Sequence, residues 1–192
     1  MTNEGGVYGT VRLLKNVMGL WILQQCRATW AEEGRLFSYS DLTALAKQAH
    51  KRDIALINPN DPIFLAPGNH PQHIRQLCQQ SGHSVPETVG EIVCVVLQSL
   101  AMAYRDVLRE LTAVSNRTVA VIHIVGGGTQ NKLLNQMTAN ATGLPVMAGP
   151  IEATVIGNAL VQLITLGEIK DIQEARQIVA EMGMMERYDP LG

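Results

Sequence analysis

The chain has 192 residues, of which 46% are hydrophobic and 17% are charged, a balance that is typical of a packed protein and excludes a disordered one. Fifteen basic and seventeen acidic side chains give a formal net charge of −2 without any basic block, which argues against a nucleic-acid partner. The most apolar long stretch, residues 92–103, is too short to cross a bilayer, and no leader peptide opens the sequence. We therefore expect a cytoplasmic protein that binds neither membrane nor nucleic acid.

The cysteines do not predict a metal site or a redox pair. Cys26, Cys78 and Cys94 are far apart and share none of the spacings that bind zinc or form redox motifs. Two of them, Cys26 and Cys94, lie within apolar helical patterns, where cysteine usually behaves as a small hydrophobic residue.

The first half of the chain is predicted to be almost entirely helical. Residues 1–6 are too polar and glycine-rich to begin a core element. Apolar residues at helical spacing predict a helix over 12–33, with Trp21 in the core, and a short helix over 41–50 follows. Asparagine, proline and glycine interrupt the pattern over 51–68.

Helices and strands then alternate along the chain. Helices are predicted over residues 71–82, 86–114, 131–142, 151–166 and 171–182, and strands over 121–125 and 144–148. This order is typical of an α/β protein. Two strands are too few for a free-standing parallel sheet, which is normally covered on both faces, so a part that completes the sheet is expected to be missing.

Three consecutive glycines stand where the first strand ends and a helix begins. Without Cβ atoms, the backbone of Gly126, Gly127 and Gly128 can approach a flat or anionic ligand closely. A phosphate-binding P-loop is excluded because Leu133 stands where its hydroxyl residue belongs. A Rossmann dinucleotide turn is excluded because Asn131 replaces its third glycine and no acid ends the next strand.

A platform for a nucleoside is the remaining binding hypothesis. Gly126 and Gly127 would let a purine and a ribose lie on the main chain, and Asn131 would offer its amide to an edge of the base. From the triplet alone, a strand-to-helix turn that needs glycine only for its geometry is an equal alternative.

Other polar residues have a simpler interpretation. His123 lies among valines and isoleucines just before the glycine run, and we predict a core residue rather than a catalytic base. His70 and His73 are expected at the surface, because a spacing of three residues alone is poor support for a metal site. Gly157 is expected to allow close helix packing.

The runs from His123 to Gln136 and from Gly149 to Ala159 closely resemble the C-terminal, ATP-binding domain of the FGGY carbohydrate kinases. Residues 2–6, 14–21 and 57–61 resemble further segments of that family, in the same order. The resemblance runs nearly end to end. It is strongest to the members of the family that phosphorylate L-rhamnulose.

This resemblance implies an α/β fold of the ribonuclease-H-like, actin-like ATPase class, helix-rich with a small partial sheet. Residues 1–192 would form part of the C-terminal nucleotide-binding domain. The cofactors would be ATP and Mg²⁺, and the γ-phosphoryl group would pass to a small sugar, giving L-rhamnulose 1-phosphate. By the same resemblance, Gly127, flanked by Gly126 and Gly128, would contact ATP, and Asn131 would lie near the adenine.

The family's N-terminal sugar-binding domain and its catalytic aspartate, which follows a histidine, have no counterpart here. No His-Asp pair occurs in the sequence. Because phosphoryl transfer needs a base and a metal as well as positioned phosphates, we expect no catalytic residue in this chain and a missing N-terminal kinase half as its partner. Two alternatives stay open: a non-catalytic nucleotide-binding or interaction module, and an inactive remnant of a kinase gene.

Overall fold

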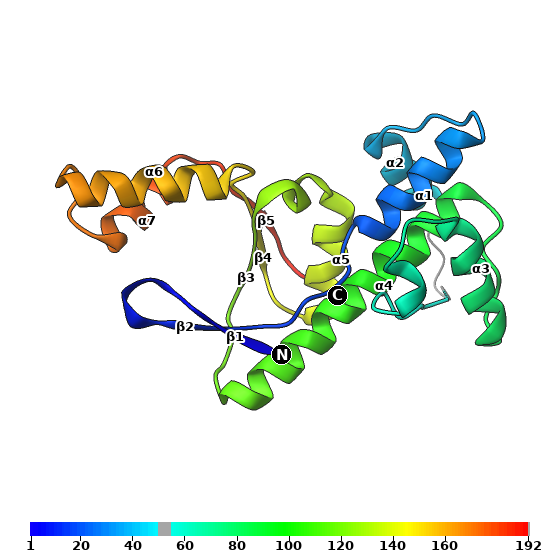
Figure 1. Cartoon of the computed structure of the whole chain (residues 1–192), viewed down its shortest axis with the longest axis horizontal. Coiled ribbons are helices and arrows are strands. Elements are labelled where there is room, and N and C mark those ends of the chain that lie inside the picture. The colour runs from blue at the N-terminus through cyan, green and yellow to red at the C-terminus, as the bar shows by residue number, and fades with distance from the viewer. Residues whose placement is uncertain (50–54, 192) are drawn as a thin grey trace. The chain divides into compact units, whose positions relative to one another are not determined.

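The structure is a computed structural model that describes residues 1–49 and 55–191 (Figure 1). Its internal contacts divide the chain into two compact units, Met1–Thr118 and Val119–Gly192, here called unit 1 and unit 2. Each unit has its own helices, strands and buried side chains. Among the described residues, no helix combines the length and the apolar character that a bilayer-crossing segment requires.

Unit 1 opens with a β-hairpin. Strand β1 (Thr2–Gly5) pairs antiparallel with β2 (Val11–Leu14), in a register that places Thr2 opposite Leu14. One turn of 3-10 helix, Val7–Gly9, connects the two strands. Strand β1 is exposed along its whole length, in line with the prediction that residues 1–6 begin no core element, whereas the prediction that a helix begins near residue 12 is wrong.

The hairpin forms because of its turn rather than because of an apolar pattern. Tyr8 and Gly9 both have positive φ angles, 55° and 70°, which reverse the chain so that the two strands can pair. Tyrosine adopts this conformation rarely, so its side chain gives no sequence signal for it. The spacing between the leucines of β2 and the apolar residues of the following helix matches a helical repeat. The predicted helix therefore began too early, within β2.

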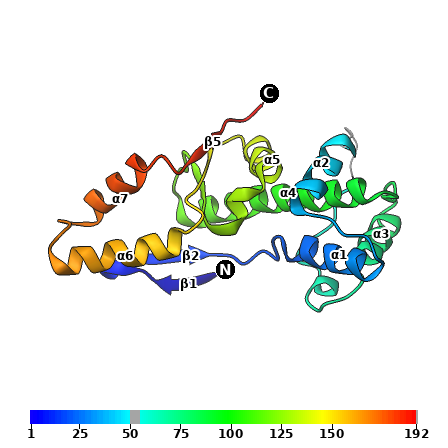
Figure 2. The ribbon, with the colours of Figure 1, turned by 90° about the horizontal axis from the view of Figure 1, so that it is seen from above.

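Four α-helices follow the hairpin in the described part of unit 1. The first three cluster around the first half of the fourth, which is the longest (Figure 2). The four helices are α1 (Trp21–Glu32), α2 (Tyr39–Ala49), α3 (His70–Gln80) and α4 (Val89–Ser115). The helices predicted over 71–82 and 86–114 are confirmed. So is the helix predicted over 41–50, apart from its last residue, which lies outside the described residues.

The ends of α4 follow from its capping residues. Thr88 and Glu91 form a reciprocal capping box, in which Glu91 N–H donates to Thr88 Oγ1 at 3.2 Å and Thr88 N–H donates to the Glu91 carboxylate at 3.1 Å. Asn116, in the left-handed conformation, ends the helix. The apolar side chains of its first half, from Ile92 to Ala101, are buried and form the centre of unit 1.

The loop before α3 contains a buried polar cluster. The ring of His70 is fully buried, with Nδ1 3.0 Å from the carbonyl oxygen of Gly68 and Nε2 3.4 Å from that of Phe64. The indole N–H of Trp21, which is half-buried, donates to the same Phe64 oxygen at 3.0 Å. The prediction of a surface position for His70 is therefore wrong, because the carbonyls of this loop receive its ring, and Trp21, predicted in the core, is half-buried.

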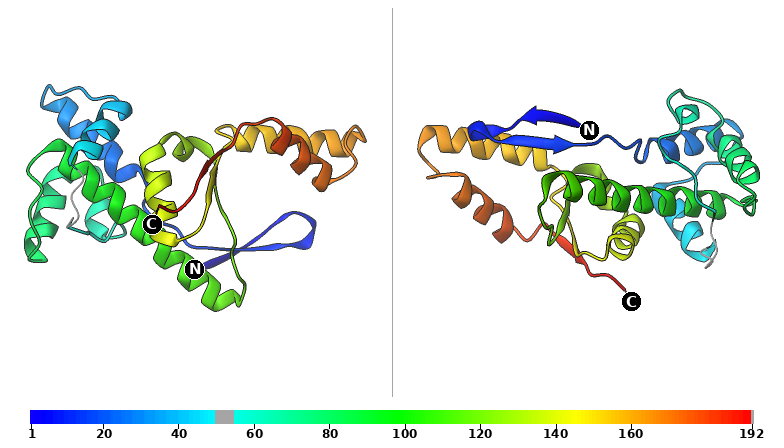
Figure 3. Two further views of the ribbon diagram at one scale, coloured as in Figure 1. Left: turned by 180° about the vertical axis from the view of Figure 1, so that it is seen from behind. Right: turned by 90° about the horizontal axis from the view of Figure 1, so that it is seen from below.

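Unit 2 contains a three-stranded sheet of the described residues, in the order β3-β4-β5 (Figure 3). Strands β3 (Ile122–Ile124) and β4 (Val146–Ala148) are parallel, and β5 (Glu186–Tyr188) is antiparallel to β4. The two predicted strands are confirmed. The third was missed because only one of its three side chains, that of Tyr188, is buried, so it has no apolar alternation.

Three helices accompany this sheet in the described part of unit 2: α5 (Lys132–Thr142), α6 (Ala153–Leu166) and α7 (Ile172–Glu181). All three were predicted. Ala139 of α5 packs with Val146, Ala148 and Tyr188 to form the core against the sheet. Helices α6 and α7 pack on each other around a second apolar cluster, which includes Leu160.

Two predictions about single residues in unit 2 are wrong. His123 is exposed, because Ile122 and Ile124 turn inward and a strand side chain alternates between the two faces. Gly157 is also exposed, and a Cβ built there would meet nothing within 4 Å, so α6 makes no close helix contact at this point of unit 2.

Candidate functional site

The glycine triplet forms a short 3-10 helix, Gly126–Gln130, directly after β3. The backbone enters it through Val125 in an extended conformation, and Gly126 then takes a φ of 75°. Gly126 N–H donates to the carbonyl of Pro150 at 3.2 Å, and Gly149 N–H donates to that of Ile124 at 2.8 Å. These two bonds tie the turn to the segment that follows β4, so the ends of two parallel strands meet here.

The backbone of the triplet faces open space within unit 2. A Cβ built on Gly126 or Gly127 would meet nothing within 4 Å, and one on Gly128 would meet only Cγ2 of Ile124, at 3.7 Å. Gly127 is exposed. The bend is therefore not packed shut, which is the condition on which the nucleoside hypothesis depends.

The three glycines differ in whether the fold requires them. Gly126 needs to be glycine because its positive φ strains an L side chain. Gly127 and Gly128 have neither a positive φ nor a close neighbour that excludes a side chain. Turn geometry alone accounts for Gly126 but not for the other two, which favours a ligand that lies on their main chain.

Asn131 lies at the junction between this turn and α5, where it is the N-cap. Its Oδ1 accepts the N–H of Leu134 at 3.0 Å, and its own backbone N–H donates to Gly128 at 3.2 Å. The side-chain oxygen is thus used by the helix. The amide N–H₂ is the part of Asn131 that can contact a base.

Two buried side chains beneath the turn were not singled out from the sequence. Thr129 Oγ1–H donates to the carbonyl of Gly126 at 2.7 Å, and Asn135 Nδ2–H donates to the carbonyl of Thr129 at 2.9 Å. Thr129 is 8% exposed and Asn135 is fully buried. The signal that was available is a threonine three residues after the first glycine, a spacing at which its hydroxyl can bond back to the main chain.

The charged groups beside the turn are paired with each other. Lys132, at the start of α5, forms an ion pair with Glu186 of β5, with Nζ 2.8 Å from Oε2. The hydrogen bond to Glu186 raises the pKa of the Lys132 ammonium, and the same bond lowers the pKa of the Glu186 carboxylate. Lys132 therefore joins α5 to β5. In a P-loop the lysine binds phosphate instead, so this ion pair agrees with the exclusion of a P-loop.

Among the described residues, few carboxylates lie near the turn that could bind a metal ion or act as a general base. Glu152 precedes α6 as its N-cap residue and is exposed, without a side-chain hydrogen bond to the helix. Over residues 1–49 and 55–191, no group of three or more histidine, cysteine, aspartate or glutamate side chains is arranged to hold a metal ion. The turn thus exposes main chain, bordered by the amide of Asn131.

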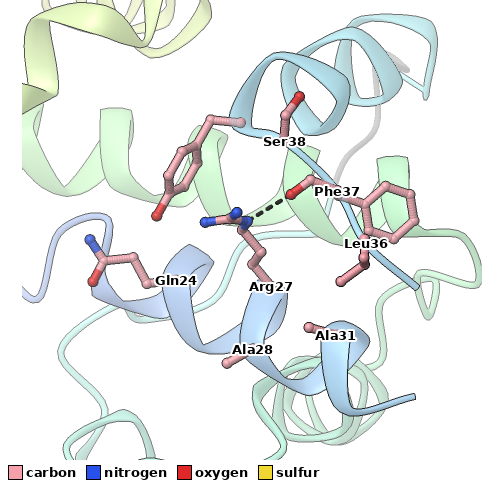
Figure 4. Close-up of a pocket in the computed structure, with 8 residues that line it drawn as sticks. Gln24, Arg27, Ala28, Ala31, Leu36, Phe37 and Ser38 are labelled. Carbon is pink, nitrogen blue, oxygen red and sulfur yellow. Dashed lines mark hydrogen bonds between the residues drawn. The ribbon is translucent and has the colours of Figure 1, made fainter. Parts of the chain in front are cut away.

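A hollow of about 620 Å³ belongs to unit 1 (Figure 4). Arg27 of α1 crosses it: Nε–H donates to the carbonyl of Phe37 at 2.7 Å, and the guanidinium lies 4.9 Å from the centre of the Tyr39 ring. These contacts connect α1 to the segment that leads into α2. The eight lining residues include no carboxylate and no histidine, so we assign this arginine a structural role.

Comparison with known proteins identifies the family. Residues 1–166 match the family model described as the FGGY family of carbohydrate kinases, C-terminal domain. The chain belongs to this family.

Relatives within the FGGY family cover almost the whole chain. Rhamnulokinase from Bacteroides thetaiotaomicron is 46% identical over 98% of the chain, and rhamnulokinase from Bacillus subtilis is 38% identical over 98% of it. Rhamnulokinase from Yersinia pestis is 43% identical over 99%. The chain spans 38% of the length of each of these relatives.

Solved structures confirm the fold. Xylulose kinase from Rhodospirillum rubrum matches 90% of the chain with a TM-score of 0.57 at 19% identity, and 33% of its own length is covered. Ligand-bound xylulose kinase from Lactobacillus acidophilus matches 90% with the same TM-score at 15% identity, and 34% of its length is covered. The predicted class, an α/β actin-like ATPase fold that is helix-rich with small sheets, is therefore correct.

Proposed function

We propose that the turn at residues 126–131 binds an adenine nucleotide, and that this chain is the C-terminal ATP-binding portion of a sugar kinase. The observation that supports this most directly is the open main chain of Gly127 and Gly128, which the fold itself does not require. Asn131 then offers its amide N–H₂ to the base, while its oxygen caps α5. In this proposal residues 1–192 are one partial nucleotide-binding domain.

The reaction proposed for the complete kinase is transfer of the γ-phosphoryl group of ATP to L-rhamnulose, giving L-rhamnulose 1-phosphate and ADP. Support comes from relatives at 38–46% identity that are rhamnulokinases. Mg²⁺, when bound with ATP, offsets the charge of its phosphates. We place this kinase in the cytoplasm, where ATP, its phosphoryl donor, is abundant.

The proposal divides the work between two parts of the kinase. The described residues supply a nucleotide platform, whereas the base and the sugar-binding groups belong to a preceding part, which is therefore the proposed partner. Helix α6 and the short segment before it carry several exposed apolar side chains, at 37–74% exposure, which another polypeptide surface would cover. These are Ile151, Val155, Val161, Leu163 and Leu166.

The test is reconstitution. The purified chain is titrated with ADP and with Mg-ATP by calorimetry, and ADP release is then measured with L-rhamnulose. We expect nucleotide binding but no sugar-dependent turnover by the chain alone. Turnover should appear when the N-terminal portion of the Bacteroides relative is added. Turnover by the isolated chain would contradict the division of labour.

The same experiment separates the two alternatives. A non-catalytic nucleotide-binding or interaction module would bind ADP and remain inactive after the N-terminal portion is added. An inactive remnant would bind no nucleotide at all. Gly127→Val in the reconstituted mixture is the matched control, since it should abolish turnover without changing the fold.

A further inference from the structure

A relay of hydrogen bonds lies beneath the glycine turn and ends at a fully buried amide. Asn135 Nδ2–H donates to the carbonyl of Thr129, and Thr129 Oγ1–H donates to the carbonyl of Gly126. Asn135 lies on the first turn of α5, inside unit 2, and has no exposed atoms. The relay therefore connects the interior of the unit to the first residue of the turn.

This relay determines which way the turn presents its main chain. In a trans peptide the C=O and the following N–H point in opposite directions. Because the carbonyl of Gly126 points inward to the Thr129 hydroxyl, the N–H of Gly127 points away from it. A nucleotide that lies on the open side of Gly127 would then meet a donor whose direction is already set.

The amide of Asn135 does not serve packing alone. Neither its buried Oδ1 nor the buried Tyr188 hydroxyl has a hydrogen-bond partner at normal length among the described residues, but the hydroxyl interacts with the side chains of Glu186 and Asn135. A buried acceptor without a normal hydrogen bond is unfavourable for folding, and a leucine, which has the same branched shape, would avoid it. What asparagine provides and leucine lacks is the N–H that holds Thr129.

We propose that Asn135 and Thr129 are positioning residues that hold the glycine turn in the shape that receives the nucleotide. This inference rests on the proposed function for its ligand, ADP or Mg-ATP. Its structural part, that the relay keeps the turn in one conformation, concerns the free chain and is measurable without any nucleotide.

The test uses pairs of variants in the full chain. Thr129→Val removes the hydroxyl that holds Gly126. Thr138→Val is its matched control, because Thr138 is also buried and its Oγ1–H also donates to a backbone carbonyl, that of Leu134, at 2.7 Å within α5. Thr129→Ser keeps the hydroxyl and serves as the rescue variant.

Asn135 is tested in the same way. Asn135→Leu removes the N–H that holds the Thr129 carbonyl, so this carbonyl loses its donor. Tyr188→Phe, which removes the hydroxyl that interacts with the Asn135 side chain but leaves the Nδ2–H bond to Thr129 in place, is its control.

Two measurements are made on each variant. Hydrogen–deuterium exchange in the segment 126–131 should be about tenfold faster in Thr129→Val and Asn135→Leu than in wild type, as expected for the loss of one buried hydrogen bond. Thr138→Val and Tyr188→Phe should exchange at the wild-type rate. Affinity for ADP should fall about tenfold in the first pair, remain unchanged in the controls, and return with Thr129→Ser.

The outcomes separate the two hypotheses. If wild type binds neither ADP nor Mg-ATP, the proposed function fails, and exchange alone decides whether the relay holds the turn. Equal exchange in Thr129→Val and Thr138→Val overturns the positioning role. So does faster exchange in the turn that leaves the affinity for ADP at the wild-type value.

Discussion

Asn131 Oδ1 accepts the backbone N–H of Leu134 at 3.0 Å, so a single side chain both begins α5 and borders the glycine turn. The two roles use different atoms. The cap needs the oxygen, and a base would be met by the N–H₂ group. Substitutions can therefore remove one role and keep the other.

Asn131→Ser should separate the two roles. Serine caps helices about as well as asparagine, so stability should stay within about 0.5 kcal/mol, whereas Asn131→Ala should lose about 1 kcal/mol. Both variants lack the amide, so both should bind ADP about fivefold more weakly. Thermal unfolding and calorimetric titration measure the two effects. Wild-type affinity in Asn131→Ser would show that the amide does not contact the nucleotide.

A second prediction concerns the glycines of the turn. Of the three, only Gly126 is required to be glycine by its backbone conformation. Gly126→Ala should lower stability by about 1–2 kcal/mol, since Gly126 has a φ of 75°. Gly127→Val should leave stability within about 0.5 kcal/mol, because its side chain meets no neighbour. Its methyl groups would occupy the place of the nucleotide, so affinity for ADP should fall by more than about tenfold.

Chemical denaturation and ADP titration of both glycine variants test this pair. Gly128→Ala is a graded control, because its Cβ would make an ordinary contact with Ile124 at 3.7 Å. If Gly127→Val binds ADP as wild type does, the triplet is a turn only, and the nucleotide site lies elsewhere.

Much of unit 2 was predictable because its elements carry strong local signals. The apolar runs that end at Val125 and Ala148, each followed by glycine, predict β3 and β4 correctly. Strand β5 was not predictable, since it is held by pairing with β4 and by one buried side chain, that of Tyr188. Pairing between distant segments leaves no periodic pattern in a three-residue strand.

The candidate site divides in the same way. The glycines were identified from the sequence because absent side chains in a row are a local signal. The relay from Asn135 to Thr129 was not, because an asparagine on the first turn of a helix looks the same whether its amide meets solvent or a buried carbonyl. His70 shows the same limit: its burial depends on the carbonyls of a loop whose path the sequence does not reveal.

The three thiols should be unreactive in the folded chain. All three are buried, and burial raises the pKa of Cys94 to about 11 and also raises those of Cys26 and Cys78 above their usual value. The thiolate is the reactive form, so alkylation by iodoacetamide at pH 8 should be about a hundredfold slower in the native chain than in guanidinium.

The sign of the pH dependence follows from the same shifts. The folded chain holds these protons to higher pH than the unfolded chain does, so their contribution to stability is complete below pH 9 and is lost as the pH rises toward 11. When the pH is raised from 8 to 10, the melting temperature should fall. Over the same range the rate of thiol labelling should rise. Rapid labelling of a native thiol at pH 8 would show that its burial opens readily.

Two helical glycines should respond to alanine in opposite directions. In α4, a Cβ on Gly90 would lie 2.5 Å from the carbonyl oxygen of Leu45 in α2, a backbone atom that cannot move aside, so Gly90→Ala should destabilise unit 1 by about 1–3 kcal/mol. In α6, Gly157 has open space around its Cβ position, and Gly157→Ala should stabilise unit 2 by about 0.5–1 kcal/mol. Hydrogen exchange in α4 and α6 reports the two units separately.

Gly157→Ala also probes the proposed partner surface, because it lies on the helix whose apolar side chains are exposed in the isolated chain. If the N-terminal part of the kinase packs closely on α6, the same alanine that stabilises the free chain should weaken reconstituted turnover. Gln173→Ala on α7 is the control, since it changes a polar side chain that is not one of these. Stabilisation together with full turnover would mean that the partner does not approach the helix at residue 157, and the exposed apolar side chains would then need a different occupant.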